Sequence, residues 1–379
     1  MLRTIALFLG TILFLAGLMA GYIYYVFEIR SKTEPKARTN QTSTKAVIHK
    51  SARRQMNRLW IYTELYKYLK DNEDKIENQF YPIPGLRESK TIDSKSGQIS
   101  MCTSMTPQGI AVTDKYIFVS AYCKTHTHHS MIYVINKKSH KFIKEIILPG
   151  RPHVGGMAYD RVNQNLWVTC SDNGIAAVAA IALDDIMAYD LDEEQKPIGY
   201  LYKYPLYTIT RSSFMTYYGN KLYVGYFTTK GDSTIQSFLL DERGAIVQTK
   251  SKDYENLVKD AMISEVVDEA DISKHVQGMA LSGSRLLLAQ SYGLYNSKIT
   301  VYDNTNGNSN FTEAQAINKI ILPRQLEQIC IDGGDLYMIY ESAAYAYRAI
   351  PLPTVDYIIK INLYDTLKID KKDLDIVGD

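Results

Sequence analysis

Three of the seven histidines of the chain lie within four consecutive residues. The segment reads Cys123-Lys-Thr-His-Thr-His-His, so it presents His126, His128 and His129 close to a cysteine. On extended backbone His126 and His128 project to the same side, because side chains alternate along a strand. Imidazole and thiolate suit zinc, copper or nickel, and His153 or Cys123 would have to complete the site. The segment predicts a metal site, with a surface loop that binds no metal as the alternative.

The four cysteines are too few for a disulfide-rich scaffold. Cys102 lies just before an apolar strand pair and Cys123 just after it, so the two residues could meet at one edge. Spacing alone does not establish pairing. A Cys102–Cys123 disulfide and two free thiols therefore both stay open, and Cys330 in an apolar run is expected to be a buried thiol.

A second set of polar residues stands at or near the start of short apolar runs, as in Gln108-Gly-Ile-Ala-Val and Gln277-Gly-Met-Ala-Leu. Amide and carboxylate oxygens suit a hard cation such as calcium, and a histidine beside carboxylates can act as a general base. The alternative is that these side chains satisfy backbone groups and water. The candidate ligand-binding residues are Gln108, His153, Gln277, Glu327, Glu341 and Arg348.

These residues are positioned by a strand pair that recurs five times between about residue 105 and residue 365. The units begin at residues 108, 155, 212, 277 and 327. Third strands, often opened by serine, and fourth strands such as 142–148 and 316–322 complete the pattern. Four antiparallel strands at this period are typical of a propeller blade.

The fold class predicted is therefore all-β, a β-propeller over residues 80–379. Five blades are expected, with six or seven as alternatives if the termini build divergent blades. The innermost strand of each blade lines a central channel, so equivalent positions should converge there. The ring predicted on this basis consists of Gln108, Gly155, Ser212, Gln277 and Glu327.

Residues 4–27 carry no charge and are long enough to cross a bilayer as a helix. The apolar run continues past Leu18-Met-Ala, a poor cleavage site, so we expect an uncleaved transmembrane anchor over residues 1–27. Basic residues follow the span, which the positive-inside rule would hold in the cytoplasm. Large domains translocate largely regardless of charge, so the expected arrangement is a single-pass membrane protein with an extracytoplasmic propeller.

Between anchor and propeller, residues 28–45 are polar and basic and predict a linker. Residues 46–79 carry apolar side chains every three or four positions, which predicts an amphipathic stalk helix. Such a helix would pack on the propeller or on a second copy of itself. The alternative is a helix that binds a membrane surface or a partner.

The Gln-Gly-Ile/Met-Ala strands, the serine-led third strands and His153-Val-Gly-Gly-Met-Ala resemble secreted and surface bacterial propellers of the NHL, YVTN and lactonase-type families. Tyr340-Glu-Ser-Ala-Ala-Tyr345 is similar to a segment of uncharacterised bacterial surface propellers. The resemblance implies a propeller. Lactonase propellers share a calcium set of Glu, Asn and Asp around the channel, whereas this ring holds Glu327 as its one acid.

The net charge of +2 gives no reason to expect nucleic acid binding, and the chain lacks a nucleophile elbow and a phosphate-binding glycine loop. The function predicted is a binding module for a protein, peptide or glycan at the cell surface, and not an enzyme. The alternatives are a calcium-dependent hydrolase or lactonase that uses the channel, and a structural or regulatory surface protein.

Overall fold

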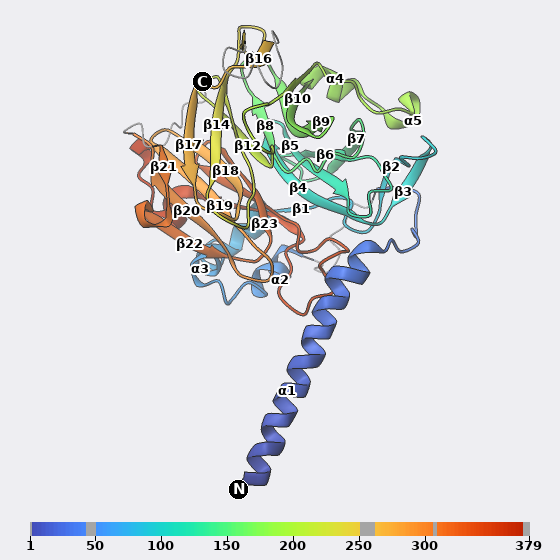
Figure 1. Cartoon of the computed structure of the whole chain (residues 1–379), viewed down its shortest axis with the longest axis vertical. Helices are drawn as coiled ribbons and strands as arrows, with labels where there is room; N and C mark the ends of the chain where they lie inside the picture. The colour runs from blue at the N-terminus through green and yellow to red at the C-terminus, as the bar shows by residue number, and fades with distance from the viewer. Residues whose placement is uncertain (1, 43–50, 251–261, 306–308, 374–379) are drawn as a thin grey trace.

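The computed structural model describes residues 2–42, 51–250, 262–305 and 309–373. Its body is a five-bladed β-propeller, which confirms the predicted fold (Figure 1). Every blade contains four antiparallel strands that lie side by side from the channel outward. The inner strands contact one another around the ring in the order β4, β8, β12, β18, β23 and back to β4.

The strands of each blade, from the channel outward, have the following bounds. Blade one consists of β4 (Met105–Val112), β5 (Tyr116–Cys123), β6 (Met131–Asn136) and β7 (Phe142–Ile147). Blade two consists of β8 (Met157–Asp160), β9 (Asn165–Asp172), β10 (Ile175–Ala182) and β11 (Tyr202–Pro205). Blade three consists of β12 (Phe214–Tyr218), β13 (Lys221–Gly225), β14 (Ser233–Leu239) and β17 (Asp268–Ile272), with β21 (Asn310–Phe311) added in parallel.

Blade four consists of β18 (Val276–Ser282), β19 (Arg285–Gln290), β20 (Ser297–Asp303) and β22 (Asn318–Leu322). Blade five consists of β23 (Leu326–Asp332), β24 (Asp335–Tyr340), β25 (Tyr357–Asn362) and β1 (Phe80–Pro82). Outside the blades lie the hairpins β2 (Ser89–Ile92) with β3 (Ile99–Cys102) and β15 (Gln248–Lys250) with β16 (Met262–Ser264). Short helices are α4 (Leu183–Ala188), α5 (Leu191–Glu194), η4 (Glu313–Gln315), α6 (Leu363–Leu367) and η5 (Lys371–Asp373).

The ring is closed by β1, which precedes the first blade in sequence but pairs with β25 of the last blade. Phe80 lies opposite Ile359, is 1% exposed, and packs edge-on against Tyr357 with ring centroids 5.6 Å apart. The segment before the repeats therefore completes blade five and does not build a further blade.

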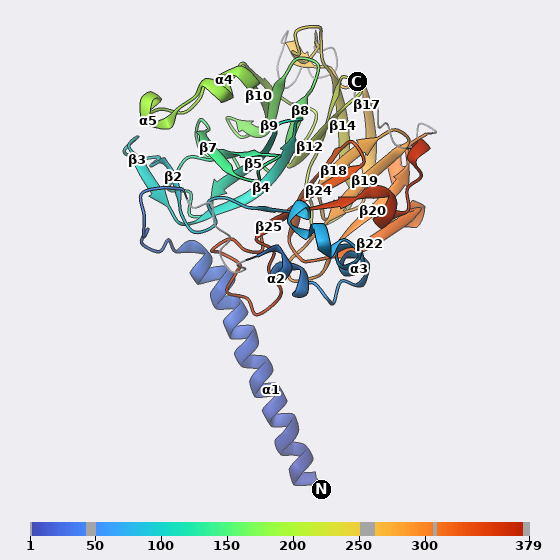
Figure 2. The ribbon, with the colours of Figure 1, turned by 180° about the vertical axis from the view of Figure 1, so that it is seen from behind.

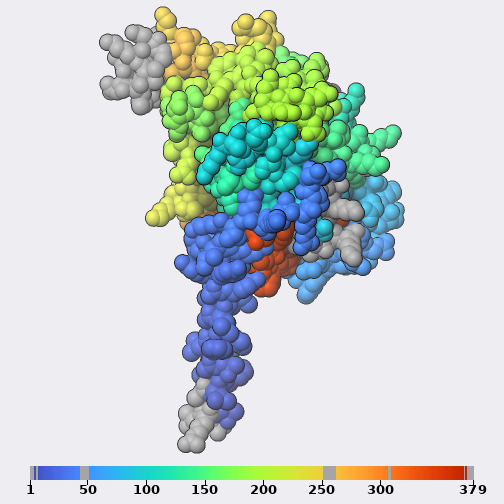
Figure 3. All heavy atoms as spheres, turned by 90° about the vertical axis from the view of Figure 1, so that its right-hand side faces the viewer, coloured from blue at the N-terminus to red at the C-terminus, as the bar shows by residue number. Residues whose placement is uncertain are grey.

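The N-terminal helix α1 (Leu2–Tyr24) continues as the π-helix η1 (Tyr25–Ile29) and the 3-10 helix η2 (Arg30–Lys32). It is long and apolar enough to cross a membrane, and it projects from the body as a separate column of atoms (Figure 3). Beyond η2 the predicted linker packs on the propeller as far as it is described, because the Glu88 carboxylate accepts hydrogen bonds from the backbone of Arg38 and Thr39.

The prediction of one continuous helix over residues 46–79 is wrong. The structure has α2 (Ala52–Asn57), α3 (Thr63–Asp71) and η3 (Glu73–Gln79), and residues 46–50 lie outside the described part. The helix is interrupted by turn residues between Asn57 and Thr63. Most of its apolar side chains are buried in one core with blades four and five. The helix α3 lies next to β22 (Figure 2), and η3 contacts β25. The segment therefore packs on the propeller, which is one of the two arrangements expected for it.

Candidate functional site

A cavity of about 500 Å³ opens at one end of the channel. Its walls include all five members of the predicted ring, namely Gln108, Gly155, Ser212, Gln277 and Glu327. Two further candidates, His153 and Glu341, also line it. The predicted convergence is found in the structure, whereas a ligand-binding role of these residues stays a prediction.

Backbone bulges aim three of the ring side chains into this cavity. The pairing of inner and second strand shifts register between Pro107 and Ile110 in blade one. Equivalent shifts flank Gln277 in blade four and Glu327 in blade five. A bulge inserts an extra residue and turns a side chain away from the regular alternation. The three longest polar side chains of the ring therefore stand at irregular strand positions.

Gln328 is a buried side chain, next to Glu327 in the sequence, that joins the inner strands to one another. Its Oε1 accepts hydrogen bonds from the backbone N–H groups of Ile110 and Met157, both at 2.9 Å. Its Nε2 donates to the carbonyls of Met157 at 2.6 Å and Met215 at 2.9 Å. These partners belong to β4, β8 and β12, two or three residues after the ring members of the same blades. One side chain therefore connects the inner strands of three blades to β23 across the axis. A side chain at Gly109 would place Cβ 2.8 Å from the Gln328 Oε1, which explains the glycine.

Glu327 and Glu341 form a hydrogen-bonded carboxyl pair at the cavity wall. Burial, together with the charge of Glu341, raises the pKa of Glu327 well above its ordinary value. Burial raises the pKa of Glu341 to about 7, against the opposing effect of Lys124. The amide of Gln108 also donates to Glu341 at 3.1 Å. Near neutral pH the pair therefore holds a proton between its two carboxyl groups.

Lys124 balances the charge that remains on this pair. Its ammonium donates to the hydroxyl groups of Tyr347 at 2.8 Å and Tyr122 at 3.2 Å. Burial raises the pKa of both phenols well above the ordinary value, so they stay protonated at neutral pH. The ring of Tyr122 also contacts His153, with centroids 4.2 Å apart. The ammonium and the shared carboxylate have opposite charges, and the guanidinium of Arg211 adds a further positive charge to the cavity lining.

The same observations bear on the predicted calcium ring. Glu327 and Glu341 hydrogen bond to each other, Gln108 turns its N–H₂ group toward Glu341, and Lys124 is close enough to lower the pKa of both acids. Calcium prefers several converging, charged oxygen ligands. Among the residues described, this wall favours hydrogen bonding to a polar ligand, and channel calcium stays a prediction.

A smaller cavity of about 180 Å³ adjoins the first and shares Lys124, Gln277, Glu327, Glu341 and Tyr347 with it. Its other walls include Phe27 and Ser31, which lie at the end of the membrane-helix segment. The Phe27 ring packs against Tyr347 with centroids 5.9 Å apart. The channel mouth is therefore on the side of the propeller from which the anchor emerges.

Arg348 does not line either cavity, contrary to the prediction. Its Nη1 donates to the carbonyl of Leu86 at 2.8 Å, and its guanidinium lies 5.2 Å from the centre of the Tyr345 ring. Burial lowers its pKa to about 10. Arg348 therefore fixes the loop after β24 to the segment before β2. The guanidinium of Arg30, at the end of the anchor, also lies over the Tyr345 ring, 3.8 Å from the ring centroid.

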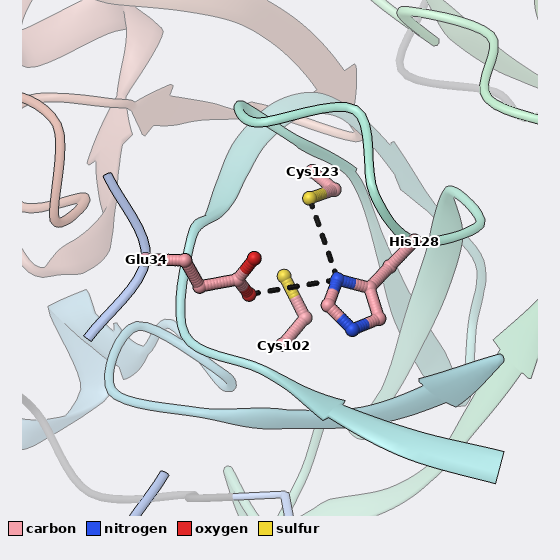
Figure 4. Close-up of side chains that lie close together, drawn as sticks. All are labelled: Glu34, Cys102, Cys123 and His128. Atoms are coloured by element: carbon pink, nitrogen blue, oxygen red, sulfur yellow. Dashed lines mark hydrogen bonds and ion pairs between the residues drawn. The ribbon is translucent and has the colours of Figure 1, made fainter. Parts of the chain in front are cut away.

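A second site lies at the edge of blade one and consists of Glu34, Cys102, Cys123 and His128, which we call the thiol cluster (Figure 4). One ligand atom of each lies within 4.8 Å of all the others. Both cysteines are free thiols in the structure, which is one of the two possibilities that the sequence left open. The sequence singled out three of the four residues and missed Glu34.

The neighbouring histidines lie apart from the thiol cluster. His126 adopts a left-handed backbone with φ of 55°, is exposed, and its carbonyl accepts from Arg151. His129 places its Nδ1 between the carbonyl of Leu148 and the N–H of Gly150, at 2.9 and 3.2 Å. The structure therefore does not bring His126, His128 and His129 together, because the loop turns at His126 and does not continue as a strand.

No protein-family model and no curated protein matches the sequence. Solved structures that it resembles include hydrazine synthase of Kuenenia stuttgartiensis, at 12% identity and a TM-score of 0.34 over 62% of this chain and 55% of that one. The chain thus spans little more than half the length of that protein. A nidogen/laminin complex aligns at 14% identity and a TM-score of 0.36 over 69% and 84% of the two chains. A Bacteroides uniformis protein provisionally described as a 6-phosphogluconolactonase aligns at 11% identity and 0.33, over 60% and 62%. At these values the propeller assignment rests on the blade topology.

Proposed function

We propose that the chain is a membrane-anchored binding protein whose channel-mouth cavity takes the sugar end of a glycan. The observation that carries the proposal is the polar cavity at which the five inner strands converge. Its volume of about 500 Å³ falls within the range of small-ligand sites, roughly 300–1,000 Å³. Amide, carboxyl, phenol and ammonium groups on its wall can donate to and accept from several hydroxyl groups at once.

Aromatic side chains at the rim support a sugar ligand. Phe227 lines both cavities and Tyr292 lines the smaller one. Tyr292 is 45% exposed, and its ring stacks on His275 with centroids 4.4 Å apart and almost parallel planes. Flat, partly exposed rings next to hydrogen-bonding groups suit sugars, which combine apolar faces with polar edges.

The anchor supports a location at a membrane surface. Phe27 and Ser31 form part of the wall around the smaller cavity. If α1 spans the bilayer, a ligand in the cavity lies close to the headgroups. We propose an extracytoplasmic propeller, because large domains translocate largely regardless of flanking charge. The ligand would then be a glycan displayed near the extracytoplasmic surface of the membrane that α1 spans.

The test uses the full chain in detergent or nanodiscs, first on a glycan array and then by calorimetry with the best glycan. Gln277→Leu and Tyr292→Ala should each weaken binding by about tenfold, which corresponds to about 1.4 kcal/mol. Tyr295→Ala is the matched control, since Tyr295 is 75% exposed and lines neither cavity. Absence of glycan binding, or equal affinities for all three variants, would overturn the proposal.

A second candidate function is hydrolysis of the bound glycan, favoured by the proton held between Glu327 and Glu341 near neutral pH. Such a pair could supply both an acid and a base. Glycosidase carboxyls usually stand about 5–9 Å apart, whereas these two are in hydrogen-bonding contact, so binding is the preferred function. Product formation by the wild type that Glu341→Gln abolishes without loss of binding would establish hydrolysis instead.

A further inference from the structure

The thiol cluster has the dimensions of a tetrahedral metal site (Figure 4). The His128 Nδ1 lies 3.6 Å from the Cys123 Sγ and 3.5 Å from a carboxylate oxygen of Glu34. Tetrahedral zinc with bonds of about 2.0–2.3 Å places neighbouring ligand atoms about 3.3–3.8 Å apart. Both separations fall in this range, so an ion could bind with small movements of the side chains. Two thiols, an imidazole and a carboxylate are a donor set that suits zinc.

Hydrogen bonds outside the cluster hold the donors in suitable orientations. The His128 Nε2 lies 3.2 Å from the Ser100 hydroxyl, which can accept the Nε2 proton. The lone pair of Nδ1 then faces the cluster, and a metal ion would replace its present contact with the Thr127 hydroxyl at 2.9 Å. The Ser104 N–H donates to the Cys102 Sγ at 3.4 Å. Hydrogen bonds to the far ring nitrogen and to the sulfur atoms are typical of zinc sites.

The carboxylate of Glu34 is oriented in the same way. Its Oε2 accepts from the hydroxyl groups of Thr125 and Thr127, both at 2.9 Å, and its Oε1 accepts from the Thr103 N–H at 2.9 Å. Oε1 is also the atom that faces His128. A glutamate from the predicted linker is thus fixed over two cysteines by three hydrogen bonds from blade one and its approach segment.

We propose that the thiol cluster is a structural zinc site that fastens the membrane anchor to blade one. Four protein ligands fill a tetrahedral shell, and Cys102, Cys123 and His128 are buried. The ligands come from three separate parts of the chain: the stretch just after η2, the end of β3, and the end of β5 with its following loop. One ion therefore crosslinks the linker that follows the anchor to the propeller, next to the channel mouth.

The experiment measures zinc in the full-length chain, purified in detergent under reducing conditions and reconstituted with zinc alone. Wild type should hold one zinc per chain, and Glu34→Gln, Cys123→Ser and His128→Asn should bind at least about tenfold more weakly. His126→Asn and Cys170→Ser are matched controls and should keep the metal, because neither residue belongs to the thiol cluster. Cobalt(II) in place of zinc should show thiolate charge-transfer absorption that Cys123→Ser removes.

Two further measurements keep the proposal falsifiable if a ligand variant fails to fold. Ser100→Ala leaves every ligand in place and should lower zinc affinity by about 10–100-fold, with an unchanged melting temperature at saturating zinc. Chelation of the wild type should speed proteolysis between residues 33 and 42 while the propeller stays intact. A Cys102–Cys123 disulfide in protein alkylated directly from cells, absence of bound zinc, or equal loss in His126→Asn and His128→Asn would overturn the proposal.

Discussion

Replacing Gln328 by leucine tests whether one side chain joins the inner strands. Gln328 is buried and makes four hydrogen bonds to the backbone of Ile110, Met157 and Met215. Leucine has a similar size but no polar atoms. The substitution therefore leaves two buried N–H groups without this hydrogen-bond partner and removes one hydrogen bond from each of two carbonyl groups. A stranded buried group costs roughly 1–3 kcal/mol and carbonyls tolerate loss better, which gives about 4 kcal/mol in total.

The matching change in melting temperature follows from the size of the propeller. Unfolding entropy is about 2.1 cal/mol/K per residue, so about 4 kcal/mol over residues 80–373 corresponds to a fall of about 6 °C. Fluorescence of Trp167, which is fully buried in blade two, can report the transition. Gln290→Leu is the matched control, because among the described residues the Gln290 side chain makes two hydrogen bonds, to the Lys274 carbonyl and the Thr300 hydroxyl. It should melt about 2–3 °C below wild type.

The order of two substitutions at residue 328 gives a sharper result. Alanine leaves a polar space in which water can replace the lost amide, whereas leucine fills that space with apolar atoms. Gln328→Leu should therefore be the less stable variant, opposite to the usual order for buried positions. If Gln328→Leu melts no lower than Gln290→Leu, or if alanine is clearly worse than leucine, the central hydrogen bonds do not stabilise the ring as argued.

The other predictions concern the carboxyl pair and the closing strand. Because burial raises the pKa of Glu341 to about 7, the stability linked to it is complete below its unfolded pKa of about 4.3 and is lost as pH rises through 7. Between about pH 5 and pH 8, the melting temperature of wild type should therefore fall relative to that of Glu341→Gln as pH rises. Parallel melting curves would show that the carboxyl is not perturbed. Phe80→Ala should cost about 3–5 kcal/mol, since Phe80 is buried against Tyr357 in the strand that closes the ring. The control Trp60→Ala, at a side chain that is 66% exposed, should stay within about 0.5 kcal/mol, and equal effects of the two changes would contradict closure by β1.

The repeat predicted the residues of the channel mouth because a propeller places equivalent positions of each unit around one axis. Gly155 and Ser212 share no chemistry with Gln108, yet all three line the same cavity. Residue type alone would not have grouped them. Position within the repeat did so without any knowledge of the intervening loops.

The central position of Gln328 could not be predicted by the same reasoning. Regular alternation places Glu327 and Gln328 on opposite faces of a strand. The register shift between Leu326 and Ile329 breaks this alternation, so Glu327 lines the cavity while Gln328 hydrogen bonds to the inner strands of three other blades. A bulge has no clear signal in a single sequence when the residues involved also fit regular strands.

The sequence predicted the proximity of the two cysteines of the thiol cluster but not the presence of Glu34. Cys102 and Cys123 bracket one strand pair, so their proximity follows from local order along the chain. Glu34 is separated from the cysteines by the rest of the linker, α2, α3 and the β2–β3 hairpin, and its position depends on how the linker packs. The prediction that His126 and His128 project to the same side assumed extended backbone. It is wrong because the chain turns at His126, which has a positive φ.

The position of the anchor restricts how a ligand can approach the channel mouth. The Tyr22 hydroxyl donates to the carbonyl of Ala349 at 2.9 Å, and Phe27 packs on Tyr347. Tyr347 in turn accepts a hydrogen bond from Lys124, whose charge lowers the pKa of Glu341. The anchor is thus connected to the carboxyl pair through one ring and one ammonium, and it forms a wall of the smaller cavity. With α1 across a bilayer, this wall faces the membrane, so a ligand would enter from the side of the mouth and meet Tyr292 and Phe227 first.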